Sequence, residues 1–307
     1  MDEPGTPEGT LDLGDLRDRW AQCDQVREVA RQAESDWDRR LLCARSLDED
    51  RVGAHRVYAA AERYLGIAEE NHGALVSLLG TFGATPTVPW NLLRPSFEAA
   101  FRALWLLKPE DSQERRRRGV QLEWLDDEAA RKYRNVTLRS PDLLRSLGVP
   151  DDVVVASRES GRDNTRIYQA EADQLGLRYR TKDWKGRKIS PTPFRVVVEG
   201  ELGKLVPDDA MLTLGFQTTW KTLSGITHSE GSALLRVSDH RTEGAYKGGR
   251  QLRMSINDGA FYVAAISTTL LRVMAWSRYG ECHQPANRGP VDLSTLRSIV
   301  ARAIPDS

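Results

Sequence analysis

The sequence predicts an all-α protein, a multi-helix bundle with a long loop or insertion near residues 157–207. Helical spacing of apolar residues recurs along most of the 307-residue chain. The composition, 40% hydrophobic and 29% charged, suits one large domain or two ordinary ones with buried cores. The single β-like stretch, FRVVVEG at 194–200, has no evident partner strand, so a helix start is equally consistent with it.

The N-terminal half divides into a tail and four expected helices. Residues 1–10 are acidic and rich in Pro and Gly, which predicts a disordered tail before a single helical domain at 11–307. Stretches 14–46 and 49–79 are rich in Ala, Arg and Glu, and Gly80 and Gly83 stop the second one. We therefore expect an antiparallel pair within 14–80. The next stretch, WNLLRPSFEAAFRALWLLKP, is apolar around much of its circumference, which predicts a central helix. A more exposed helix should follow, with the run RRRR at 115–118 as solvated surface.

The C-terminal half is expected to complete a central bundle at 88–280. Residues 157–207 are charged and punctuated by Gly and Pro, which favours the loop or insertion. Helices should resume at 208–236 and 257–279, separated by the Gly-rich turn TEGAYKGGR, and a last helix is expected at 291–304. The most apolar window, 256–276, contains Asp258 and Arg272, so we interpret it as a buried helix and expect no membrane contact.

Charge and cysteine content narrow the class of protein. The 44 basic and 44 acidic side chains cancel, so nucleic acid would have to bind a local patch. Three cysteines without CxxC spacing argue against a disulfide framework or thiolate zinc site, and the chain starts without a secretory signal, which together indicate a cytoplasmic protein. Because HExxH, Walker and GxGxxG motifs do not occur, we expect neither a metal nor a cofactor.

Two stretches, LLRPSFEAAFRALWLL at 92–107 and TTWKTLSGITHSEGSALL at 218–235, carry a family resemblance. Together they resemble a mainly actinobacterial branch of all-α proteins related to the HEPN superfamily, over about the middle two-thirds of the chain. The family pattern pairs a helix carrying Arg and Glu one turn apart with a helix carrying an aromatic residue, Leu-Ser and then His. These positions are Arg94, Glu98 and Trp105 on the first helix and Trp220, Leu223, Ser224 and His228 on the second.

The resemblance implies an all-α bundle that often forms a homodimer and that in some members is a metal-independent ribonuclease. The nuclease members carry an Arg, a gap of about one turn or more, and a catalytic His on one helix. This chain departs from that pattern, because Lys221 stands two turns before His228 and Ser224 occupies the nearer position.

The residue types predict a candidate catalytic site by themselves. Arg94 and Glu98 stand at i and i+4, and Ser224 and His228 do the same, so each pair shares a helix face. If the faces meet, Glu98 would hold one ring nitrogen of His228, while Arg94 and Ser224 would bind a phosphate. The alternative is structural: Arg94 and Glu98 pair with each other and fill a polar gap between the helices.

Two further groups of residues each have two possible interpretations. The run RYRTKDWKGRK at 178–188 interleaves basic and aromatic residues, so Arg178, Lys182, Trp184 and Lys185 would bind RNA or a nucleotide, and a plain exposed loop is the alternative. A second cluster, His55, Tyr58 and Glu62, shares one helix face and would approach the central site or form a polar layer between helices.

Two functions follow from these alternatives. One is a ribonuclease with His228 as general acid or base. The other is a non-catalytic helical module that binds a nucleotide or protein in a defence or toxin-antitoxin setting. An imidazole open to solvent favours the enzyme, whereas an enclosed one favours the module.

Overall fold

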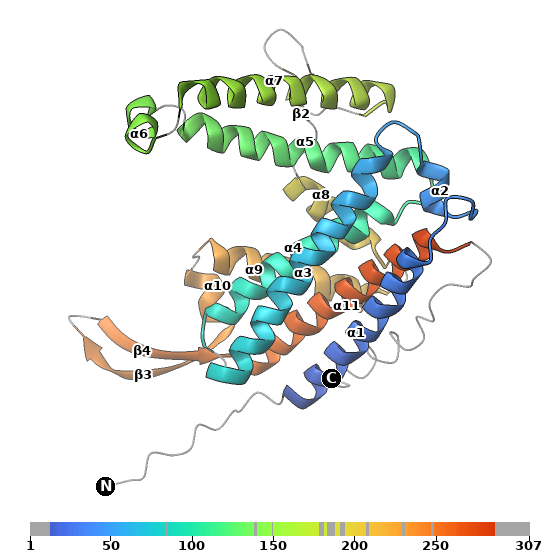
Figure 1. The fold of residues 1–307 in the computed structure, drawn as a ribbon. Coiled ribbons are helices and arrows are strands. Elements are labelled where there is room, and N and C mark those ends of the chain that lie inside the picture. The colour runs from blue at the N-terminus through green and yellow to red at the C-terminus, as the bar shows by residue number, and fades with distance from the viewer. Residues whose placement is uncertain are drawn as a thin grey trace.

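A computed structural model describes residues 13–83, 85–137, 140–148, 150–177, 181–182, 188–190, 194–206, 209–228, 231–246 and 249–285. The predicted tail at 1–10 and the predicted helix at 291–304 lie outside these ranges. The described chain is an all-α bundle with two small hairpins, as the sequence predicts for the fold class (Figure 1). Its elements are α1 (Leu13–Ser35), α2 (Ala44–Asp48), α3 (Ala54–Phe82), α4 (Val88–Leu107), α5 (Ser112–Thr137), α6 (Pro141–Ser146), α7 (Asp151–Gln174), β1 (Thr181–Lys182), β2 (Lys188–Ser190), α8 (Phe194–Glu201), a 3₁₀ turn (Leu202–Lys204), α9 (Ala210–Thr227), α10 (Gly231–Arg236), β3 (Ser238–Tyr246), β4 (Gly249–Ile256) and α11 (Asp258–His283).

Helix α4 is central, as predicted, and packs against α3, α11 and α9. Its apolar residues cover most of the circumference, and Trp90, Phe97 and Phe101 are fully buried. Burying each such side chain contributes roughly 1.5–3 kcal/mol, so α4 holds the bundle together. The helix continues through Pro95 and begins at Val88, so residues 94 and 98 keep their i, i+4 relation.

The predicted N-terminal pair is wrong in its packing. Helix α1 ends at Ser35 and packs mainly along α11, where the backbones approach so closely that a Cβ on Gly280 would lie 3.1 Å from Ala30 Cα. Helix α3 packs instead along α4. Side chains still link α1 to α3, because Trp20 meets the ring of His72 edge-on. Amphipathic periodicity identified the helices but could not say which apolar faces meet.

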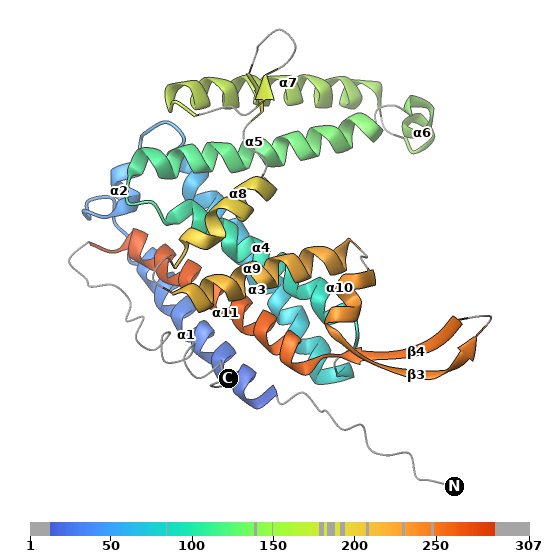
Figure 2. The ribbon, with the colours of Figure 1, turned by 180° about the vertical axis from the view of Figure 1, so that it is seen from behind.

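The expected loop at 157–207 is wrong for its first part. Helix α7 runs through 157–174 and lies beside α5 in both views of the fold (Figure 1, Figure 2). Tyr168, Ala172 and Leu175 are buried against Val120 and Trp124 of α5 in a core separate from the main one. The i, i+4 pair at 168 and 172 supplies this apolar face. FRVVVEG forms most of α8, so the helical alternative is confirmed.

The run at 115–118 is not solvated surface, and this expectation is corrected. Arg115 forms a buried pair with Asp48, and Arg116 donates to the carbonyl of Val52 (3.0 Å). Arg117 donates to the carbonyl of Leu175, and Arg118 donates to that of Trp105 (2.6 Å). The four guanidinium groups therefore bind the backbone of the loops and helices around α5.

The predicted helix at 208–236 is divided, and the predicted turn after it is a hairpin. Helix α9 ends at Thr227 and the short α10 follows. Strands β3 and β4 pair antiparallel from Ser238 opposite Ile256 to Tyr246 opposite Gly249, and the hairpin projects from the bundle (Figure 1, Figure 2). The alternation of this segment is weak, which is why Gly-rich composition alone predicted a turn.

Helix α11 is a long apolar helix that lies mostly inside the bundle. It is long and apolar enough, by length and composition, to cross a membrane, yet 72% of its most apolar window is buried inside the bundle. Asn257 caps its start by accepting a hydrogen bond from the amide of Ala260 (2.8 Å). The buried-helix interpretation of 256–276 agrees with this packing.

Candidate functional site

Helices α4 and α9 pack directly on each other, which confirms the predicted arrangement of the two motif helices. Phe97 of α4 stacks on Trp220 of α9 with ring centroids 6.4 Å apart. On the same face of α4, Arg94 Nε donates to Glu98 Oε1 (2.7 Å), and Arg102 Nη2 lies 3.6 Å from Glu98 Oε2. The carboxylate of Glu98 thus lies between two guanidinium groups of its own helix.

Arg94 is largely sheltered from solvent. Its side chain is 18% exposed and its Cζ lies over the ring of Trp220, 6.0 Å from the centroid. Its Nη1 atom is buried and has no hydrogen-bond partner among the described residues. The guanidinium is therefore held by Glu98 and an indole face, as in the structural alternative.

His228 lies apart from this cluster. It follows the last residue of α9, its amide donates to the carbonyl of Ser224 (3.1 Å), and its side chain is exposed. Across the described residues no hydrogen bond joins His228 to Glu98, so the expected carboxylate–imidazole pair is corrected. The reason is axial distance: α9 meets Arg94 at Trp220, and eight residues separate Trp220 from His228, or about 12 Å of helix.

The basic run at 178–188 lies almost entirely outside the described residues. Arg178, Trp184 and Lys185 are not described, and Lys182 is described only as part of the short strand β1. Their assignment to an RNA or nucleotide site therefore stays a prediction.

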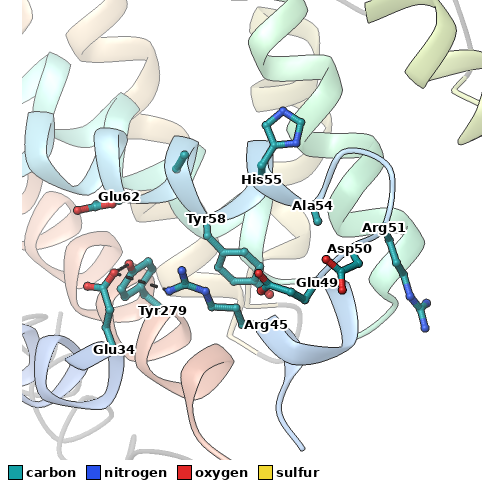
Figure 3. A pocket seen from close by; sticks show the side chains of 11 residues that line it. Glu34, Arg45, Glu49, Asp50, Arg51, Ala54, His55, Tyr58, Glu62 and Tyr279 are labelled. Atoms are coloured by element: carbon teal, nitrogen blue, oxygen red, sulfur yellow. Dashed lines mark hydrogen bonds and ion pairs between the residues drawn. The ribbon is translucent and has the colours of Figure 1, made fainter. Parts of the chain in front are cut away.

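A pocket of about 570 Å³ opens where α1 ends and α2, α3 and α11 converge (Figure 3). This volume is within the range of small-molecule sites. His55, Tyr58 and Glu62 line it along one face of α3, so this cluster faces the pocket and not the Glu98 cluster. The other lining residues are Glu34, Arg45, Glu49, Asp50, Arg51, Ala54, Ala59 and Tyr279.

Two tyrosines form hydrogen-bonded parts of the pocket wall. Tyr279 donates its hydroxyl to Glu34 Oε1 (2.5 Å), and Tyr58 donates to Asp48 Oδ2 (2.8 Å). Burial raises the pKa of both phenols well above their usual range, and the Glu34 carboxylate raises that of Tyr279 further. Both hydroxyls therefore stay protonated and act as donors.

Arg45 places its guanidinium group in the pocket wall, against two aromatic rings. Its Cζ lies 4.1 Å from the ring centroid of Trp37 and 5.4 Å from that of Tyr58. Its Nη1 donates to His283 Nε2 (2.8 Å), and the other ring nitrogen of His283 donates to the carbonyl of Tyr279 (2.7 Å). Burial lowers the pKa of His283, which favours the neutral ring that this arrangement requires.

Sequence reasoning identified three pocket residues but missed the others. Glu34 and Arg45 come from the consecutive helices α1 and α2, but Tyr279 comes from α11, far along the chain, and no local spacing links it to them. The one available signal was the polar face at positions 55, 58 and 62, spaced by three and four residues.

Metal ligands and thiols are two further groups of interest in the described part of the chain. It contains no group of three or more His, Cys, Asp or Glu placed to hold a metal ion. Burial raises the pKa of the Cys23 and Cys282 thiols to about 12, so neither is a ready nucleophile.

Comparisons of the chain with protein-family models, curated proteins and solved structures find no match. The HEPN-like resemblance therefore stays a prediction, and the function has to be argued from the geometry.

Proposed function

We propose that the chain is a HEPN-like helical module that binds a partner and does not cleave RNA. One observation carries the proposal: Glu98 pairs with Arg94 and Arg102 of its own helix and makes no hydrogen bond to His228 within the described residues. A general acid or base needs a group that orients its ring, and the cluster supplies none.

The residue predicted to bind a phosphate is already engaged within the fold. Arg94 is the side chain that would hold a phosphate, yet it is sheltered and already donates to Glu98. Binding an anion there would break this ion pair. The cluster instead fixes the packing of α4 on α9, a role that buried polar networks often have.

The pocket described above is a suitable site for binding a ligand. The pocket between α1, α2, α3 and α11 is concave, has aromatic walls and carries several charged groups, which is the usual form of a ligand site. Most of its wall comes from helices, which hold its geometry. A module of this kind would act by recognising a ligand.

A ribonuclease is the second candidate, and the exposure of His228 favours it. The imidazole is open to solvent and stands one turn after Ser224, so a phosphate could reach both side chains without opening the bundle. The predicted basic run at 178–188 would then guide the strand.

Purified protein incubated with total RNA separates the two functions. We expect wild type, His228→Ala and His240→Ala to leave the RNA equally intact, His240 being an exposed histidine of the hairpin. RNA cleavage by wild type and by His240→Ala, lost in His228→Ala, would overturn the binding-module proposal and establish the ribonuclease.

A further inference from the structure

The lining of the pocket between α1, α2, α3 and α11 carries more negative than positive charge. Four carboxylates line it against two guanidinium groups and one imidazole. Asp50 pairs with Arg39 outside the pocket. The side chains of Glu49 and Glu62 make neither an ion pair nor a hydrogen bond with any residue that the structure describes. Two carboxylates therefore face the pocket without a partner, which disfavours an anionic ligand.

The aromatic walls suit a positive charge. Tyr58 and Tyr279 both line the pocket, and ring faces attract cations. Arg45 shows that this wall accepts a cation, because its guanidinium lies over Tyr58 and 3.9 Å from Glu34. The same surroundings would accept an ammonium group beside Glu62, whose charge acts on the Tyr279 hydroxyl.

The pocket is elongated along α3. Its lining on this helix runs from Ala54 to Glu62, which is about 12 Å at the rise of an α-helix. Figure 3 shows Glu62 and Glu49 on opposite sides of Tyr58, with Glu49 contributed by the segment after α2. A linear molecule with a positive group at each end would match both free carboxylates.

We propose that this pocket binds a small linear polyamine, with its ammonium groups at Glu62 and Glu49 and its methylene chain along the α3 wall at Tyr58 and Ala59. This inference rests on the binding-module function and names its ligand class. Each end would gain a charge-assisted hydrogen bond. The methylene chain between them would lie along this wall, as apolar stems of cations do on apolar surface.

Isothermal titration calorimetry at low ionic strength tests the proposal with spermidine, putrescine and propylamine. Saturable binding of spermidine is expected, with propylamine at least tenfold weaker because it carries one charge. Glu62→Gln and Glu49→Gln should each weaken spermidine binding about tenfold, equal to ~1.4 kcal/mol. Glu70→Gln is the matched control, since it makes the same charge change on an exposed position of α3 outside the pocket, and it should bind as wild type does.

Three outcomes would overturn the proposal. The first is that spermidine shows no saturable binding. The second is that Glu70→Gln weakens spermidine binding as much as the pocket variants do. The third is that trilysine binds and spermidine does not, which would assign the pocket to lysine side chains of a protein. Circular dichroism of each variant checks the fold. The RNA assay is independent: RNA cleavage would overturn the binding module, whereas failure of amine binding alone would overturn this inference and leave the module standing.

Discussion

The buried pair between Arg115 and Asp48 gives the sharpest stability prediction. Arg115 Nε donates to Asp48 Oδ2 (2.8 Å) and its Nη2 donates to Asp48 Oδ1 (3.0 Å), with side chains 1% and 0% exposed. Tyr58 donates to the same carboxylate (2.8 Å). Arg115 also donates to the carbonyls of Pro109 and Glu110 (both 2.8 Å), so one guanidinium joins α2, α5 and the segment between α4 and α5.

Arg115→Met should lower the free energy of unfolding by about 3–5 kcal/mol, because it leaves the buried Asp48 carboxylate with one neutral donor. The backbone carbonyls near α5 also lose their donor. Arg115→Lys keeps the charge but loses the planar fork, so its loss should be smaller.

Urea unfolding followed by circular dichroism measures these losses, with the slope against denaturant checked for constancy. Arg131→Met is the matched control, being the same substitution at an exposed position of α5, and should change stability by less than about 0.5 kcal/mol. A loss below about 1 kcal/mol for Arg115→Met would refute the reasoning that this pair organises the end of the bundle.

Two further predictions concern the α1 side of the bundle. Burial lowers the pKa of His72 from 6.5 to about 3, so the folded protein favours the neutral ring. The contribution of this neutral ring to the free energy of unfolding is full above pH 6.5 and falls as the pH drops toward 3. Between pH 6.5 and 5 the free energy of unfolding of wild type, measured in urea, should fall by up to about 2 kcal/mol. That of His72→Phe, which keeps a ring beside Trp20, should fall less. An equal fall with pH in both proteins would contradict the lowered pKa of His72. Gly280→Ala should lower the free energy of unfolding by about 1–3 kcal/mol, because the added methyl group crowds Ala30. Gly66→Ala, with open space around it, should raise it by up to about 1 kcal/mol. Thermal unfolding compares the two variants, and equal effects would refute the close approach of α11 to α1 at Gly280.

Local periodicity predicted the parts of the fold that depend on local pattern. The apolar circumference of 90–109 predicted a central helix. The pattern at 208–236 predicted the helix that packs on it, although α9 ends at Thr227. The i, i+4 spacing of Arg94 and Glu98 predicted their shared face, and their ion pair follows from it.

Features that join distant segments could not be predicted in the same way. RRRR at 115–118 has the composition of a solvated surface, and its role depends on the carbonyls and the Asp48 carboxylate that the fold brings to it. His228 was placed on a continuous helix, but α9 ends one residue before it. The pocket joins Glu34 to Tyr279 across almost the whole described chain, and no sequence spacing encodes that contact.

A double-mutant cycle measures whether the side chains of Glu98 and His228 interact. Free energies of unfolding would be measured for wild type, Glu98→Gln, His228→Ala and the double variant. Because the two side chains share no hydrogen bond in the described structure, we expect the two single effects to add within about 0.5 kcal/mol. A coupling of about 1 kcal/mol or more would show that carboxylate and imidazole interact, and would contradict their separation in the structure.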